Sequence, residues 1–284
     1  MRCIVCESKK INRLFIKQGR EFLKCNYCGL VFIAHQNYLV DLGNFYNKQY
    51  YSHWEVNGKM TEITKLNKTY TFEVWLREIE KYIAKGRILD IGCAMGFFLE
   101  VAQQRGWDVY GIDVSEYAVN LAREKFGSRV SRGTLSDIHF APDSFDVITM
   151  FDVIEHLSSP TETLRNISMI LKSKGILAIS TVNTDSLSCK LMGSYWSHFK
   201  PEHLYYFSSQ NIKLILDKTG FSVLEVKDSN KFLSLSYIKS YFYVYKTPIL
   251  TTFSSLIELF TPSVLKNHPF KFKLGEMFVL AQKR

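Results

Sequence analysis

The sequence of 284 residues has no apolar run long enough to cross a lipid bilayer. Its most apolar late stretch, residues 232–260, is interrupted by two lysines, a proline and several serines. The N-terminus also lacks the apolar core of a signal peptide. Both absences predict a protein that folds in water, and we expect a cytoplasmic location.

Compositional bias is equally absent. The sequence shows no internal repeat and no low-complexity tract, and proline contributes only 6 residues. Hydrophobic residues make up 46% and charged residues 22% of the chain, which are the proportions of a packed protein rather than a disordered one. The length accommodates one large domain and a small appendage.

Basic residues are in excess, but they form no concentrated tract. The 36 Lys and Arg residues outnumber the 27 Asp and Glu residues and give a net charge of +9. This charge favours anionic partners such as nucleic acid, phosphate-bearing sugars or a membrane surface. Because no five basic residues are consecutive, solvated lysines on an enzyme surface are the preferred interpretation.

Four of the six cysteines form two C-x-x-C pairs near the N-terminus, separated by 18 residues. In a reducing compartment such pairs bind metal more often than they form disulfides. Four thiolates favour a closed, tetrahedral, structural zinc site, and the alternative is four unrelated buried thiols. The predicted zinc ligands are Cys3, Cys6, Cys25 and Cys28, while Cys93 and Cys189 stand alone.

From residue 87 onward, strand and helix patterns alternate, which predicts an α/β, doubly wound, mainly parallel sheet. A preceding helix at 61–83 is predicted from the helical spacing of apolar residues such as Leu66 and Tyr70. An aromatic-rich insertion at 230–270 is also expected to be helical. The predicted strands are 87–91, 107–112, 145–149, 175–180, 221–226 and 276–281, and the helices are 97–105, 116–126, 163–171 and 208–219.

A glycine turn follows the first of these strands. Asp90 precedes Gly92, and Gly96 opens the next helix. At the carboxyl end of a parallel strand, such a turn lets a cofactor approach the backbone. The G-x-x-x-G spacing does not complete a dinucleotide pattern, and Asp90 suits an ammonium group better than a pyrophosphate. Asp113, at the end of the second strand, is expected to bind ribose hydroxyls or, alternatively, a helix N-terminus.

The segments LDIGCAMGF, GIDVS, SFDVITMFDVIEHL and LKSKGILAISTVN resemble successive motifs of class I S-adenosylmethionine (SAM)-dependent methyltransferases, over about 87–226. The resemblance is strongest to the branch of ubiquinone-type and sugar O-methyltransferases. It implies a seven-stranded sheet, SAM as cofactor, and contacts from Asp90, Gly92, Gly96 and Asp113. It also implies Leu135 near the adenine and Phe151 beside the sulfonium. The sequence departs from the family at position 94, where alanine replaces the usual glycine.

The cysteine pairs resemble the N-terminal zinc ribbons of methyltransferases in sugar and antibiotic pathways. Among these, deoxysugar C-methyltransferases carry a further large C-terminal domain that this chain does not show, which weighs against C-methylation. The resulting domain prediction is a zinc ribbon at 1–36, a helical linker at 37–83 and a methyltransferase domain at 84–284.

Candidate catalytic residues follow the predicted strands 145–149 and 175–180. Asp152, Glu155, His156 and the distant His203 resemble the metal-binding set of O-methyltransferases that act on catechols and on small-RNA 3′ ends. Such a mixed set of ligands suits Mg²⁺, Mn²⁺ or Fe²⁺. The alternative is that Glu-His-Leu orders the loop beside SAM without metal. His203 or His156 then acts as general base, or His203 is merely a structural histidine.

The remaining polar and aromatic residues of this region have weaker assignments. His198 is expected at the surface. Trp196, Tyr205 and Tyr206 are expected either to stack on an acceptor or to pack in the core.

The predicted function is SAM-dependent O-methylation of a small molecule, sugar or lipid-linked glycan. The insertion is a candidate for peripheral membrane contact. One alternative is an RNA methyltransferase that uses the zinc ribbon and the positive charge, although nucleic acid is the less favoured partner. Another is a non-catalytic scaffold with the same fold, which the intact glycine turn and acids argue against.

Overall fold

A seven-stranded sheet forms the centre of the computed structural model, which describes residues 1–34, 45–51, 55–56, 59–60, 62–200, 202–238 and 261–284. The strand order is β12-β15-β10-β9-β6-β7-β8. Only β15 runs antiparallel to its neighbours, β10 and β12. The strands are β6 (Arg87–Ile91), β7 (Asp108–Asp113), β8 (Val130–Arg132), β9 (Phe145–Phe151), β10 (Leu171–Val182), β12 (Phe221–Asp228) and β15 (Glu276–Lys283). This confirms the predicted α/β, doubly wound, mainly parallel sheet.

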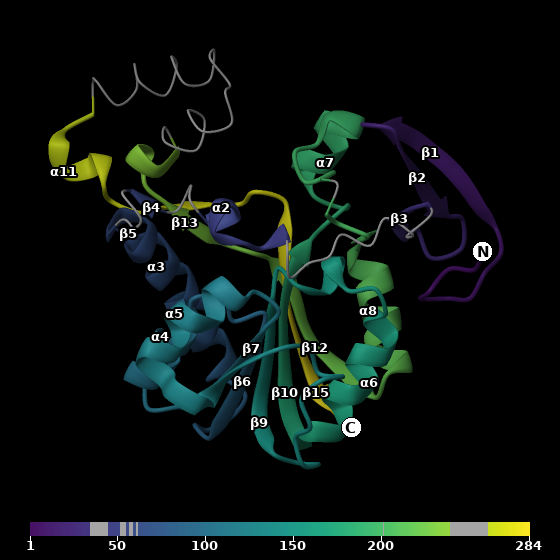
Figure 1. Cartoon of the computed structure of the whole chain (residues 1–284). Helices are drawn as coiled ribbons and strands as arrows, with labels where there is room; N and C mark the ends of the chain where they lie inside the picture. Colours follow the sequence, from purple (N-terminus) through teal and green to yellow (C-terminus); the bar gives the residue numbers. More distant parts are fainter. Residues whose placement is uncertain (35–44, 52–54, 57–58, 61, 201, 239–260) are drawn as a thin grey trace.

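Helices cover both faces of the sheet (Figure 1). One buried cluster joins α3, α4 and α5 to the sheet, and a second joins α6 and α8 to the opposite face. The central strands are therefore buried on both sides, which explains why they read as continuous apolar runs. The helices are α3 (Glu62–Ile79), α4 (Phe97–Gln104), α5 (Glu116–Phe126), α6 (Pro160–Ile170) and α8 (Ser209–Lys218).

Helix α3 buries only part of the apolar face that the spacing predicted: Ile79 is in the core, but the first half of the helix buries polar residues instead. Leu66 and Tyr70 are 39% and 42% exposed, whereas Thr64, Asn67 and Thr71 are buried. The Oγ1 of Thr71 accepts a hydrogen bond from the Phe232 backbone N–H at 2.9 Å. The buried polar stripe therefore serves contacts with a later segment, and helical periodicity alone could not reveal it.

The N-terminal module is an antiparallel sheet with order β1-β2-β3-β11. Its fourth strand comes from the methyltransferase part of the chain. The sequence did not predict this strand because Tyr205 and Tyr206 offer no alternation by themselves. The strands are β1 (Ile11–Lys17), β2 (Arg20–Cys25), β3 (Val31–Ile33) and β11 (Tyr205–Tyr206).

Short elements gather at the carboxyl end of the central strands (Figure 1). The aromatic-rich insertion begins and ends in the antiparallel pair β13–β14, and residues 239–260, where helix was expected, lie outside the described residues. In the described parts of the chain, no helix has the length and apolarity needed to span a bilayer. These elements are α2 (Lys48–Tyr51), β4 (Glu55–Val56), β5 (Lys59–Met60), η3 (Ile154–His156), α7 (Leu187–Met192), η4 (Gly193–Tyr195), β13 (Lys231–Leu233), α11 (Ser263–Lys266) and β14 (Phe270–Phe272). The short helix η2 (Gly127–Arg129) precedes β8 at the opposite end of the sheet.

Candidate active site

The turn between β6 and α4 lines a cavity of about 470 Å³. Gly92 and Gly96 have φ angles of 76° and 79°, in the left-handed region that favours glycine. A Cβ at Gly92 would lie 2.4 Å from the Val153 side chain, and one at Gly96 would lie 2.7 Å from Phe126. Gly92 lines the cavity, whereas Gly96 packs against α5. Ala94, where the resemblance implies glycine, is also left-handed, with φ 46°.

The two acids beside this turn line the same cavity. Asp90 accepts a hydrogen bond from the Thr149 hydroxyl at 2.6 Å, and burial raises the pKa of Asp90 to about 7. Asp113 accepts backbone N–H bonds from Ala94 and Ser115, both at 2.8 Å. Asp113 thus orders the glycine turn and the start of α5, and each of its oxygens keeps a lone pair for a ligand. The helix-terminal and ligand-binding interpretations are therefore compatible.

Leu135 and Phe151 also line the cavity; Phe151 ends β9, and Leu135 lies in the turn after β8. The Phe151 ring packs 4.6 Å from Trp75 and 5.0 Å from Phe98, measured between ring centroids. Their proposed contacts with the adenine and the sulfonium remain predictions.

Glu155, His156 and His203 meet at another part of this cavity. Their candidate ligand atoms all lie within 4.8 Å of one another. The two imidazole rings are perpendicular, with centroids 4.7 Å apart. Glu155 is buried and accepts a hydrogen bond from the Thr181 hydroxyl at 2.8 Å. The fold thus brings His203 next to His156, which precedes it by 47 positions in the sequence, as predicted.

Burial controls the protonation of these three side chains. It lowers the pKa of His156 to about 4 and holds the pKa of His203 well below its ordinary value. Burial, followed by the charge of Asp152, raises the pKa of Glu155 to about 8. The Nδ1 of His156 lies 3.0 Å from the Glu202 carbonyl. A carbonyl accepts only from an N–H, so this contact favours a proton on Nδ1 and leaves Nε2 as the basic nitrogen.

The Nδ1 of His203 is buried and has no hydrogen-bond partner among the described residues. At Nδ1 nothing supports a structural histidine bonded to a carbonyl, but a hydrogen bond between the imidazole and the His198 backbone acts to raise the pKa of His203. Both interpretations of His203, proton acceptor and structural histidine, therefore stay predictions. An unsatisfied buried nitrogen in a cavity wall is more typical of a ligand-binding position.

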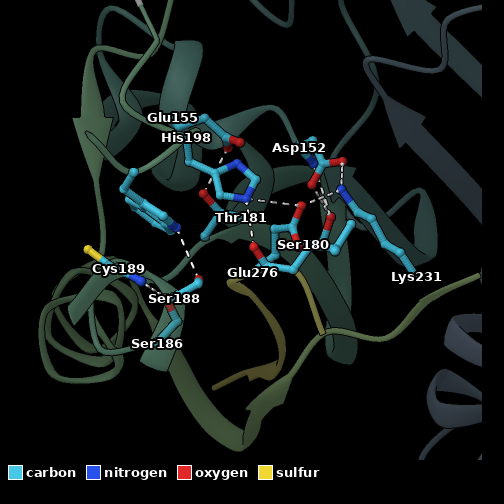
Figure 2. Close-up of polar contacts among 12 residues, drawn as sticks. Asp152, Glu155, Ser180, Thr181, Ser186, Ser188, Cys189, His198, Lys231 and Glu276 are labelled. Atoms are coloured by element: carbon cyan, nitrogen blue, oxygen red, sulfur yellow. Dashed lines mark hydrogen bonds and ion pairs between the residues drawn. The ribbon is translucent and has the colours of Figure 1, made fainter. Parts of the chain in front are cut away.

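Asp152 does not join the cluster of Glu155, His156 and His203. Figure 2 shows Asp152 beside Lys231 and Ser180 instead. Its backbone is left-handed, with φ 57°, and its carboxylate binds the Lys231 ammonium at 2.9 Å and the Ser180 hydroxyl at 2.8 Å. Burial alone would raise the pKa of Asp152, but Lys231 lowers it to about 2. Lys231 also binds Glu276 at 2.8 Å. Asp152 is therefore the counter-ion of Lys231.

Several cavity-lining residues escaped the sequence reasoning. Tyr46 places its hydroxyl 3.2 Å from the Nδ1 of His156, and Lys68 is a half-buried lysine whose pKa is lowered to about 8 by desolvation of its ammonium group. They come from segments with no recognisable motif, so only the tertiary structure identifies them. The missed residues include Tyr46, Tyr50, Tyr51, Asn67, Lys68, Lys231 and Glu276.

The later aromatic cluster packs in the core. Trp196, Tyr205 and Tyr206 are at most 1% exposed, and Trp196 and Tyr206 belong to a cluster with β2 and β3. The surface prediction for His198 is wrong. Its side chain is 15% exposed, lines the cavity, and lies with Nε2 2.9 Å from the Leu274 carbonyl.

The four N-terminal cysteines form one cluster. Their sulfur atoms all lie within 4.8 Å of one another, with Cys3–Cys28 at 3.5 Å and Cys6–Cys25 at 3.4 Å. Tetrahedral zinc with Zn–S bonds of about 2.3 Å requires sulfurs about 3.8 Å apart. The four side chains therefore suit such a metal.

Comparison with known proteins identifies the family. A methyltransferase-domain family matches residues 67–226. The ubiquinone biosynthesis O-methyltransferase of Roseobacter denitrificans is 30% identical over 218 residues, which cover 65% of this chain and 88% of that enzyme. The enzyme of the same name from Aeromonas salmonicida is 28% identical over 145 residues. That match covers 49% of this chain and 60% of the Aeromonas enzyme, so it spans less than two thirds of the relative.

Solved structures share the fold. A SAM-dependent methyltransferase of Thermotoga maritima has a TM-score of 0.54 at 18% identity, covering 87% of this chain and 99% of its own. The YcgJ protein of Bacillus subtilis has a TM-score of 0.52 at 18% identity, covering 76% and 98%. The family match, the cavity at the glycine turn and the shared fold lead to one conclusion: this chain belongs to the methyltransferase-domain family and is a SAM-dependent methyltransferase.

Proposed function

We propose that the enzyme methylates a hydroxyl group of a small molecule. The observation that carries this proposal is a single cavity that contains both the glycine turn with Asp90 and Asp113 and the cluster of Glu155, His156 and His203. A methyl donor at the turn and a proton acceptor at the cluster are what O-methylation requires.

In this proposal Asp113 binds the ribose, Asp90 and Gly92 border the methionine part, and Leu135 and Phe151 lie by the adenine and the sulfonium. Bound SAM supplies the electrophilic methyl group. His156 or His203 removes the acceptor proton, since burial keeps both imidazoles uncharged at neutral pH. The aromatic side chains of Tyr46, Tyr50, Phe232 and Tyr237 line the cavity and favour a ring-shaped acceptor such as a sugar or a phenol. The relatives named ubiquinone biosynthesis O-methyltransferase are consistent with a ring-shaped acceptor.

A divalent cation at Glu155, His156 and His203 is a second candidate feature, favoured by their mutual distances of at most 4.8 Å. One carboxylate and two imidazoles suit Mg²⁺, Mn²⁺ or Fe²⁺, and such an ion would acidify an acceptor hydroxyl. Asp152, the fourth residue of the predicted set, is excluded from this proposal because it binds Lys231.

Methyl transfer is tested with purified enzyme, labelled SAM and a cell extract, followed by mass spectrometry of small molecules. We expect label on an oxygen of a ring-containing acceptor, and label on nitrogen or carbon alone would contradict O-methylation. Methyl transfer is also assayed after mild EDTA treatment, to test for the divalent cation at Glu155, His156 and His203. The zinc content of the protein is measured in the same samples. Activity restored by Mg²⁺ or Mn²⁺ at constant zinc supports the second metal, and unchanged activity excludes it.

For the N-terminal cluster we propose structural zinc held by Cys3, Cys6, Cys25 and Cys28. All four positions are sulfur and three of the four residues are buried, so no coordination position remains for a substrate. Elemental analysis should find about one zinc per chain.

A further inference from the structure

Strand β11 connects the four-cysteine module to the candidate active site. Tyr205 and Tyr206 pair with Phe32 and Val31 of β3, and β3 directly follows the second cysteine knuckle. His203 lies two residues before this strand. The strand that completes the module's sheet therefore also carries a candidate catalytic residue.

The backbone of Leu204 makes this connection direct. Its carbonyl accepts a hydrogen bond from the Ile33 N–H at 3.1 Å, and its own N–H donates to the Glu155 carbonyl at 2.8 Å. One residue thus links β3 on one side to the turn that holds Glu155 and His156 on the other. Since backbone bonds fix the direction of the attached side chains, β3 determines how His203 faces Glu155.

Side-chain packing supports the same connection. The Tyr206 ring lies 5.6 Å from Phe22 of β2 and 5.8 Å from His203, measured between ring centroids. The Asn211 side-chain amide donates to the Cys28 carbonyl at 3.4 Å. The contact between the module and the rest of the enzyme therefore includes the residues that flank His203. None of the four cysteines lines the cavity.

We propose that the four-cysteine module is a positioning element of the active site: through β3 and Leu204 it holds His203 against Glu155 and His156. This inference rests on the proposed function of those three residues. A metal held by the four sulfurs is then required for methyl transfer but not for SAM binding, because the residues proposed to hold SAM line the cavity and none of the four cysteines does.

The test compares Cys6→Ser with Cys189→Ser, the same chemical change outside the cluster. We expect Cys6→Ser to lose zinc and to reduce kcat by at least about 100-fold, the scale of a misplaced acid–base group. The SAM dissociation constant should stay within about twofold of wild type. Cys189→Ser should keep its zinc, SAM affinity and kcat.

Imidazole ¹⁵N NMR spectra supply a readout that needs no acceptor. The signals of His203 are identified by their loss in His203→Gln. In Cys6→Ser they should shift, while those of the exposed His139 should not. A zinc-free Cys6→Ser enzyme with unchanged His203 signals and unchanged kcat would overturn the proposal.

Ile33→Pro provides a second variant that keeps all four cysteines, should Cys6→Ser fail to fold. Proline removes the one N–H that reaches Leu204. This variant should retain zinc and SAM binding but show shifted His203 signals, and unshifted signals would contradict the positioning role. If wild-type enzyme itself bound no SAM, the proposed function would fail, independently of the NMR result.

Discussion

Asp113→Asn is expected to weaken SAM binding by about 100-fold, the equivalent of about 2.7 kcal/mol. Both carboxylate oxygens of Asp113 accept backbone N–H bonds at 2.8 Å. An asparagine must turn its NH₂ group toward one of these two backbone N–H groups. Two hydrogen-bond donors then face each other, one hydrogen bond is lost, and the glycine turn is disturbed. It also replaces the anion proposed to accept both ribose hydroxyls. The measurement is isothermal titration calorimetry with SAM.

The matched control is Asp108→Asn, at the opposite end of the same strand. The Asp108 side chain is 40% exposed and pairs with Arg129 at the surface. The Asp108→Asn variant should therefore bind SAM with wild-type affinity. Melting temperatures establish that both variants fold. A dissociation constant for Asp113→Asn within threefold of wild type would contradict the proposed ribose contact.

His203→Gln is expected to lower kcat by about 100- to 10,000-fold, the contribution of a positioned proton acceptor. The buried imidazole has a lowered pKa, so it is uncharged at neutral pH and can accept a proton. Glutamine keeps a polar side chain of similar reach but provides no basic nitrogen. SAM affinity should be unchanged, because His203 lies with the acceptor cluster and not at the glycine turn.

His139→Gln, at an exposed position, is the matched control and should retain wild-type kcat. The outcome that counts against the role of His203 is a kcat within twofold of wild type at saturating acceptor. If kcat falls and SAM affinity falls equally, the substitution has disturbed the whole cavity, and the assignment of His203 to proton transfer is wrong.

The sequence predicted those features that depend on neighbouring residues. The strand, turn and helix around Gly92 follow from an apolar run, a small-residue turn and a helical pattern within about ten residues, and the two C-x-x-C pairs specify their own cluster. The mainly parallel α/β class followed from the alternation of such units, whereas the short strand β8 and the antiparallel direction of β15 were not predicted. The predicted elements are encoded locally, so they can be read from one sequence.

Features that depend on contacts between distant segments could not be predicted. Asp152 and Glu155 are three residues apart, yet the left-handed backbone at Asp152 directs one carboxylate to Lys231 and leaves the other with Thr181. Nothing in the sequence links Lys231 to Asp152, 79 positions away. The burial of Asn67 rather than Leu66 on α3 likewise depends on the segment that packs against the helix.

Calorimetric titration of the wild-type enzyme with SAM, and then with S-adenosylhomocysteine, tests the cofactor cavity most directly. We predict one binding site per chain for each ligand, with micromolar dissociation constants. An absence of binding at millimolar ligand, in protein shown to be folded, would contradict the assignment of this cavity to the cofactor.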